Sequence, residues 1–297
     1  ILQLLERFNI RYTRISQADL RKNPLRDTGW GVSSTAISVA ILSIFAVIFV
    51  VPLVQNWPYQ TQFTLAHVQA VFADSELQTV YLHSLGMALC TAFFGTLLAY
   101  GAALITARST LPKWRKQSVD SIALVTNTIP GMVLGLAFLF TFTGTPLQNT
   151  FPLMILCNIV HYFSTPYLMM KNSLSKMNAG WETTAMLMGD SWPKTILRVV
   201  TPNAASSLIE VFSYYFINAM VTISALIFLA GARTMVLTTK IKQLQYVNEY
   251  NEVFVLSLLI LFTNLLAKAI FTWLANRSAQ TGKRNNKKRK ETKPSCI

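Results

Sequence analysis

The sequence predicts an all-α integral membrane protein with six transmembrane helices. Of its 297 residues, 52% are apolar and only 13% are charged, which is about half the charge of an average soluble domain. The charged residues are also segregated, because three long stretches contain no Asp, Glu, Lys or Arg: 33–54, 79–107 and 121–170. Uncharged apolar stretches of about 20 residues are the length that a bilayer core requires.

The predicted spans follow these stretches and the turn residues between them. The stretch 121–170 must hold two helices, because a single helix of that length, rising about 1.5 Å per residue, would overshoot any bilayer. The turn residues between the two helices begin at Thr143-Gly144-Thr145-Pro146. The six spans are then placed at 33–54, 79–107, 119–141, 151–170, 207–230 and 252–275.

The distribution of Lys and Arg predicts the orientation in the membrane. Segments 1–32, 108–118, 171–206 and 276–297 carry six, four, four and eight of them. Loops 55–78 and 142–149 carry none and 231–251 carries three. By the positive-inside rule both termini are expected to be cytoplasmic. The net charge of +14 is therefore interpreted as setting the orientation of the chain in the membrane, where basic residues can contact lipid. It is not interpreted as a nucleic-acid-binding surface.

Three regions are predicted on this basis. Residues 1–32 form a cytoplasmic N-terminal segment, 33–275 form the transmembrane domain, and 276–297 form a basic cytoplasmic tail that we expect to be disordered.

The cytoplasmic loop between spans four and five is long and has the pattern of two short helices. Glu182 lies where the first helix begins, at the positive end of its dipole. Gly189 suits the left-handed position at the end of that helix. Asp190 or Ser191 can cap the second helix, which Pro202 is expected to end.

This loop resembles one carried by bacterial ABC-importer permeases, which has Glu-Ala-Ala, three residues, Gly, and a Pro thirteen residues after that Gly. Gly189 and Pro202 have this spacing. In that register the Glu-Ala-Ala positions are occupied by Thr183, Thr184 and Ala185. Glu182 lies one position early. Residues 128–136, TIPGMVLGL, are in addition similar to the third span of permeases for ferric ion and 2-aminoethylphosphonate.

The resemblance implies a permease subunit of the bacterial inner membrane that works by alternating access. Its implied partners are a cytoplasmic ABC ATPase dimer, an extracytoplasmic solute-binding protein and a second permease half, as a homodimer or as a fused or heteromeric partner. Residues 178–202 would be the loop that couples to the ATPase, and 1–32 would fit the linker of a fused permease. The implied cargo is a small solute, ferric ion or a phosphonate such as 2-aminoethylphosphonate.

Polar residues within the spans are the candidates for a translocation pathway, because ionisable and polar groups are costly in lipid. These residues lie on one helix face of span five, at a histidine in span four and at a proline-containing break in span three. They are Asn127, Pro130, His161, Glu210, Tyr214 and Asn218. No spacing of Cys, His or carboxylates predicts a metal site or a cofactor.

The chain has no phosphate-binding glycine loop and no hydrolase motif, so ATP hydrolysis is expected in a separate subunit and not in this chain. A stand-alone secondary transporter or channel is the alternative from another class, and it would need no ATPase partner. An ABC importer for another solute, such as a polyamine or thiamine, is the alternative within the class.

Overall fold

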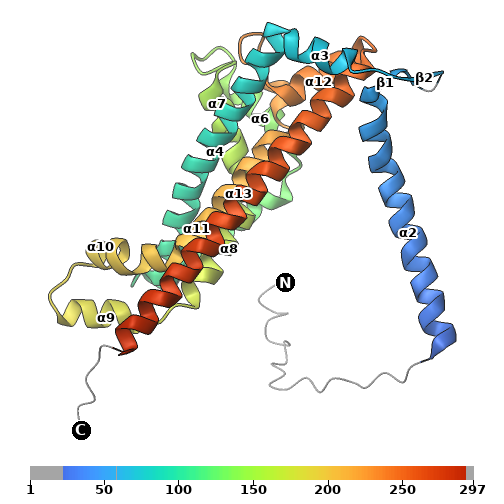
Figure 1. The fold of residues 1–297 in the computed structure, drawn as a ribbon. Coiled ribbons are helices and arrows are strands. Elements are labelled where there is room, and N and C mark those ends of the chain that lie inside the picture. The colour runs from blue at the N-terminus through green and yellow to red at the C-terminus, as the bar shows by residue number, and fades with distance from the viewer. Residues whose placement is uncertain (1–22, 58, 292–297) are drawn as a thin grey trace. The chain divides into compact units, whose positions relative to one another are not determined.

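The structure, a computed structural model, describes residues 23–57 and 59–291. The chain divides into two compact units, residues 1–47 and 48–297. Helices dominate the described residues, as the all-α prediction requires (Figure 1).

Helix α2 (Pro24–Val50) supplies the described part of the first unit. It begins earlier than the predicted span 33–54, at a proline whose missing N–H is not needed in a first turn. Within its uncharged stretch the hydroxyls of Thr35 and Ser38 donate to the carbonyls of Gly31 (2.8 Å) and Ser34 (2.9 Å). The helix thus satisfies these polar groups internally, as a lipid-facing segment requires.

Three long helices dominate the second unit. They are α4 (Ser75–Arg108), the continuous helix Trp192–Val221, and α13 (Tyr250–Glu291). Asp74 caps α4 by accepting a hydrogen bond from the backbone N–H of Glu76 at 2.7 Å. Together with α2 they are the four helices in the described chain that are long and apolar enough to cross a membrane.

Spans three and four are each built from a bent pair of helices. Helix α5 (Lys113–Val125) and the short η2 (Thr126–Thr128) meet α6 (Gly131–Phe142) at 107°. Helix α7 (Phe151–His161) meets α8 (Ser164–Ser175) at 57°. The described chain reaches six spans if each bent pair crosses the membrane once.

Prolines explain where both pairs bend. Pro130 cannot donate to a helical ladder, and Ile129 before it is extended (φ −92°, ψ 120°). In the second pair, Pro166 lies in the first turn of α8, where a proline is tolerated. The predicted turn between spans three and four is confirmed, with left-handed backbone at Gly144 (φ 77°) and Asn149 (φ 58°).

Short elements lie at the two ends of the second unit. In Figure 1, α3 and α12 lie at the end opposite to α9 and α10. The strands β1 and β2 pair antiparallel, with Val54 opposite Phe63. The short elements are η1 (Val51–Leu53), β1 (Val54–Asn56), β2 (Gln60–Phe63), α3 (Ala66–Ala73), α9 (Gly180–Leu187), α10 (Trp192–Thr195), η3 (Ile196–Val200), η4 (Leu226–Phe228) and α12 (Leu237–Tyr246).

The predicted span 207–230 is wrong at both ends. Its helix begins at Trp192 and ends as α11 (Thr201–Val221), and Thr222 is extended (φ −69°, ψ 127°). The chain leaves the helix here because tertiary hydrogen bonds replace the helical ladder. The Thr238 hydroxyl donates to the Thr222 carbonyl at 2.9 Å.

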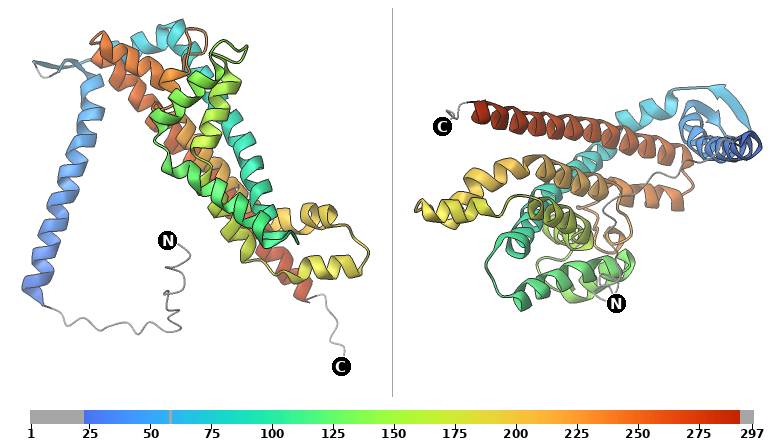
Figure 2. Two further views of the ribbon diagram at one scale, coloured as in Figure 1. Left: turned by 180° about the vertical axis from the view of Figure 1, so that it is seen from behind. Right: turned by 90° about the horizontal axis from the view of Figure 1, so that it is seen from below.

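The core lies where α11 packs against α4, α8 and α13 (Figure 2). Small residues on α4, including Gly95 and the fully buried Ala99 and Ala103, let the helices approach closely. A Cβ on Gly95 would lie 2.8 Å from the ring of Tyr215, which itself is fully buried. These small residues of α4 therefore let α11 pack directly against it.

Helix α13 continues through Glu291, so residues 276–291 of the predicted disordered tail are helical. Lys, Arg and Gln are good helix formers, and no proline interrupts this stretch. The remainder of the tail lies outside the described residues, as does most of the predicted segment 1–32.

Candidate functional site

The loop that is predicted to couple to an ATPase, residues 178–202, contains two helical segments, as expected, and is called the coupling loop below. Helix α9 carries Glu182 in its first turn, and α10 begins after Ser191 with Pro193 near its start. Asn178 does not cap α9 directly. Its side-chain oxygen instead accepts a hydrogen bond from the Gly180 N–H at 2.8 Å, which fixes the entry of the chain into the helix.

Gly189 adopts the left-handed backbone that its position predicted, with φ 78°. The Asp190 N–H donates to the Ala185 carbonyl at 2.9 Å and the Gly189 N–H donates to the Met186 carbonyl at 3.0 Å. This pair of bonds is a Schellman motif, which closes the end of α9 and turns the chain toward α10.

The prediction that Pro202 ends the second helix is wrong. The helix passes through a π-helical turn, η3, in which the Thr201 N–H donates to the Ile196 carbonyl, and Pro202 lies in the first turn of α11. The wider turn accommodates the proline ring, which would clash in a regular helix. The side-chain amide of Asn203 donates to the Val199 carbonyl at 2.7 Å. The coupling loop therefore continues without interruption into span five.

Glu182 forms a buried, bidentate ion pair with Arg108 at the end of α4. The guanidinium donates through Nε and Nη2 to the two carboxylate oxygens, each at 2.6 Å. It also donates to the carbonyls of Met177 (2.9 Å) and Asn178 (3.0 Å). The two side chains are only 3% and 14% exposed. Arg108 thus joins the end of span two to the start of the coupling loop.

The tip of the coupling loop, at the end of α9, is apolar. Met186, Leu187 and Met188 are 67%, 85% and 79% exposed. Of the three residues in the Glu-Ala-Ala positions, Thr183 and Thr184 are exposed and Ala185 is half-buried. A contiguous apolar tip of this kind is characteristic of a protein interaction site.

Asp190 pairs with Lys194 one helical turn away and so braces the turn between α9 and α10.

Glu210, Tyr214 and Asn218 share one face of α11, as their four-residue spacing predicts. All three line a cavity of about 500 Å³. Lys268 of α13 lines the same cavity, and no ion pair within 4 Å joins it to Glu210 in the described chain. The Asn218 amide donates to the Tyr214 carbonyl at 2.8 Å. This face is the most polar feature of span five.

The other three candidates lie at the breaks of the bent helices. Asn127 and Pro130 form the break between α5 and α6, and both are exposed. His161 ends α7, and its ring lies against the position where a Cβ on Gly131 would stand, at 3.0 Å. The breaks of spans three and four therefore touch each other.

Tyr162 lies between His161, at the break of span four, and Tyr214, on the polar face of α11. It was not among the candidates predicted from the sequence. Its ring centroid lies 4.5 Å from that of His161 and 6.3 Å from that of Tyr214. Its hydroxyl is hydrogen-bonded to Thr222 at the end of α11. Arg108 was also not predicted as a site residue. Its position, as the first charge after the uncharged stretch 79–107, could have indicated that it lies at the end of span two, near the loop. Among the described residues, no group of three or more His, Cys, Asp or Glu could hold a metal ion.

Known proteins resemble the chain in sequence and in fold. The family described as binding-protein-dependent transport system inner membrane component matches residues 95–280, which is more than half of the chain. A Haemophilus influenzae protein assigned as ferric transport system permease FbpB 1 is 26% identical over 206 residues, 66% of this chain and 31% of that protein. The ferric transport system permease FbpB of Actinobacillus pleuropneumoniae is 22% identical over 242 residues, 78% of this chain and 34% of that protein.

The chain thus spans about a third of the length of the curated relatives it matches. Among solved structures, a bacterial alginate ABC transporter in complex with an alginate-pentasaccharide-bound periplasmic protein has a TM-score of 0.67 and 12% identity. The match covers 85% of this chain and 96% of that chain. At this identity the likeness shows the fold alone.

Proposed function

The chain belongs to the family of binding-protein-dependent transport system inner membrane components, and from this premise we propose that it is the membrane-spanning permease of an ATP-driven importer. A separate cytoplasmic ABC ATPase dimer would supply the energy, and an extracytoplasmic solute-binding protein would deliver the solute. The observation that carries the proposal is the coupling loop, whose apolar tip is exposed and whose second helix is continuous with span five.

The apolar tip has the properties of a docking surface for the ATPase. Met186, Leu187 and Met188 project from the Gly189 turn, and the Arg108–Glu182 ion pair holds the base of α9 against span two. Flexible methionines beside an exposed leucine adapt to an apolar groove on a partner. Glu182 is engaged inside the chain, so the contact with the ATPase is assigned to the apolar tip.

Leu187→Asp is expected to weaken association with the ATPase by about tenfold or more, because a charge replaces a side chain at the centre of the apolar tip. The measurement is the amount of ATPase subunit that co-purifies with the full chain, followed by titration in nanodiscs. Val247→Asp is the matched control, since Val247 is also exposed (60%) but lies just after α12, at the opposite end of the unit. Equal association of both variants would contradict the assignment.

Movement of the ATPase would reach the membrane through the helix Trp192–Val221. At about 1.5 Å per residue, this helix is about 45 Å long. It carries the face with Glu210 and Tyr214, which is proposed to line the translocation pathway. A shift of the coupling loop would therefore move the pathway face directly, which is the geometry that alternating access requires.

The left-handed turn at Gly189 provides a test of coupling. Gly189→Ala is expected to reduce ATP-driven transport severalfold, because a left-handed alanine costs about 1–2 kcal/mol and distorts the tip. Gly144→Ala is the matched control, since Gly144 has nearly the same backbone angle (φ 77°) and also has free space around it. It lies in the turn between α6 and α7. Both variants should be destabilised by similar amounts. Only Gly189→Ala should show a lower rate of transport per bound ATPase.

The similarity of residues 128–136 to permeases for ferric ion and 2-aminoethylphosphonate supports either solute as a cargo, and the names of the two curated relatives add support for ferric iron. The pathway is proposed to be completed by a second permease half, either another copy or a related chain. Both termini are proposed to lie in the cytoplasm, on the side of the coupling loop.

Co-purification from native membranes tests the whole assignment. A stable partner with nucleotide-binding motifs supports the importer, whereas solute transport by the purified chain without one would establish a secondary transporter or channel.

A further inference from the structure

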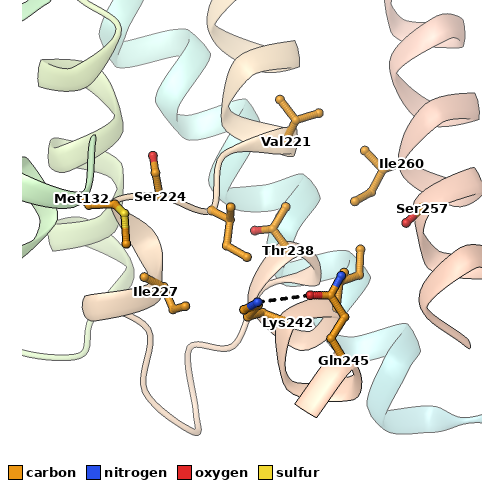
Figure 3. A pocket seen from close by; sticks show the side chains of 11 residues that line it. Met132, Val221, Ser224, Ile227, Thr238, Lys242, Gln245, Ser257 and Ile260 are labelled. Atoms are coloured by element: carbon orange, nitrogen blue, oxygen red, sulfur yellow. Dashed lines mark hydrogen bonds between the residues drawn. The ribbon is translucent and has the colours of Figure 1, made fainter. Parts of the chain in front are cut away.

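A cavity of about 570 Å³ lies beside α12 (Figure 3), and in Figure 1 α12 is at the end of the second unit opposite α9 and α10. Its walls come from α6, the end of α11 and the stretch after it, α12 and α13. This volume is in the range that holds a small organic solute. The described residues that line it are mostly apolar, with five polar side chains: Ser224, Thr238, Lys242, Gln245 and Ser257.

Lys242 contributes the one charge among these lining residues, and no carboxylate within 4 Å balances it in the described chain. Its Nζ donates to the Gln245 side-chain carbonyl at 3.3 Å and lies 5.2 Å from the ring centroid of Tyr246, both neutral groups. Lys240, two residues earlier, is different because it pairs with Glu76 at 2.6 Å. The ammonium of Lys242 therefore retains donors and a positive charge at a largely apolar wall.

The neutral polar groups complement this charge. Ser224 carries no hydrogen bond among the described residues, and its hydroxyl lies against the position where a Cβ on Gly131 would stand. The Thr238 and Ser257 hydroxyls donate to the carbonyls of Thr222 (2.9 Å) and Val253 (2.7 Å), which fixes their orientation. An ammonium beside a primary amide can recognise an oxyanion by charge-assisted hydrogen bonds.

The cavity is also connected to the parts of the molecule that would move. Thr238 bonds to the residue that ends α11, and α11 is continuous with α10. Met132 and Ser224 lie beside the break of span three, where a Cβ on Gly131 would collide with the Ser224 hydroxyl. A ligand in this cavity would therefore contact both the end of the rigid helix and the bent span.

We propose that this cavity is a binding subsite for a small solute carrying an anionic oxygen group, with Lys242 as its charged contact. The inference rests on the proposed function, because it assigns the solute class that the permease accepts at its outer end. The class is an oxyanion, such as a phosphate, phosphonate or carboxylate. It differs from a bare ferric ion, which an ammonium would repel.

The test uses the full chain in lipid nanodiscs and measures the shift of its melting temperature at constant ionic strength. Inorganic phosphate, methylphosphonate and malonate are titrated against chloride, and La³⁺ serves as a soluble trivalent cation. At least one oxyanion is expected to raise the melting temperature saturably, and La³⁺ is not. Lys242→Met should raise the half-saturating oxyanion concentration by about tenfold or more. Lys242→Arg should keep it within about threefold.

Lys240→Met is the matched control, because it removes a lysine from the same helix that does not line the cavity. Its oxyanion affinity should equal that of the unmodified chain. Absence of any saturable oxyanion shift, unchanged affinity in Lys242→Met, or saturable binding of La³⁺ would each overturn the inference. Lys242→Met should still bind the ATPase, so loss of association in Leu187→Asp reports on the proposed function separately.

Discussion

Replacing Arg108 with Met is expected to lower the free energy of unfolding by about 3–5 kcal/mol, because it leaves the Glu182 carboxylate buried and unpaired. The present pair has two hydrogen bonds of 2.6 Å and side chains that are 3% and 14% exposed. The carbonyls of Met177 and Asn178 would lose their donor as well. The measurement is the unfolding of the full chain by SDS in mixed micelles.

A double-mutant cycle separates the lost ion pair from lost packing. Glu182→Met alone should also destabilise, since the guanidinium is then buried without its carboxylate. The double substitution Arg108→Met with Glu182→Met should recover much of the loss, because two apolar side chains of similar size can replace a buried pair. Simply additive losses would mean that the two side chains do not act as a pair. The Arg108 variant should also bind the ATPase less well, as the base of α9 is no longer held against α4.

Gly135→Ala is expected to have the second largest effect, with a loss of about 1–3 kcal/mol or more. A Cβ at this position would collide with the Ala225 carbonyl oxygen and lie 2.8 Å from its Cα. These are backbone atoms of the stretch after α11, so the clash cannot be relieved by a side-chain rotation. The whole segment between α11 and α12, including a wall of the Lys242 cavity, would have to shift.

Gly101→Ala is the matched control for Gly135→Ala, since a Cβ there would meet nothing within 4 Å. Its stability should be unchanged or slightly higher, because alanine favours helix more than glycine does. Both variants are compared by melting temperature and by oxyanion affinity in nanodiscs. Equal melting temperatures would show that the approach of α6 to the Ala225 backbone is looser than the structure has it.

Much of the architecture could be predicted from the sequence because lipid imposes simple rules. Uncharged stretches predicted the apolar helices, and Gly144 and Pro130 predicted a turn and a break. Gly189 predicted a left-handed turn, since few other residues adopt that backbone. These features depend on local chemistry, which a single sequence carries.

Features that depend on tertiary contacts could not be predicted. Pro202 was expected to end a helix, but the preceding π-helical turn and the Asn203 side chain accommodate it. The end of span five depends on a bond from Thr238, which lies beyond the predicted span. The partner of Glu182 comes from residue 108, far away in the chain. The roles proposed for His161 and Glu210 remain predictions.

The uninterrupted helix from Trp192 to Val221 has a mechanical consequence. Its part beyond the π-helical turn, α11, has 21 residues and is about 32 Å long, so a tilt of about 5° about that turn displaces its far end by about 3 Å. Such a displacement is comparable to the diameter of a small ion, and at the Thr222–Thr238 bond it would be delivered to the wall of the Lys242 cavity. The wide turn at Ile196–Val200 lies within the coupling loop, directly before α11, and is the point about which α11 can pivot. Small rotations of an ATPase at one membrane face would thereby open or narrow a cavity at the other.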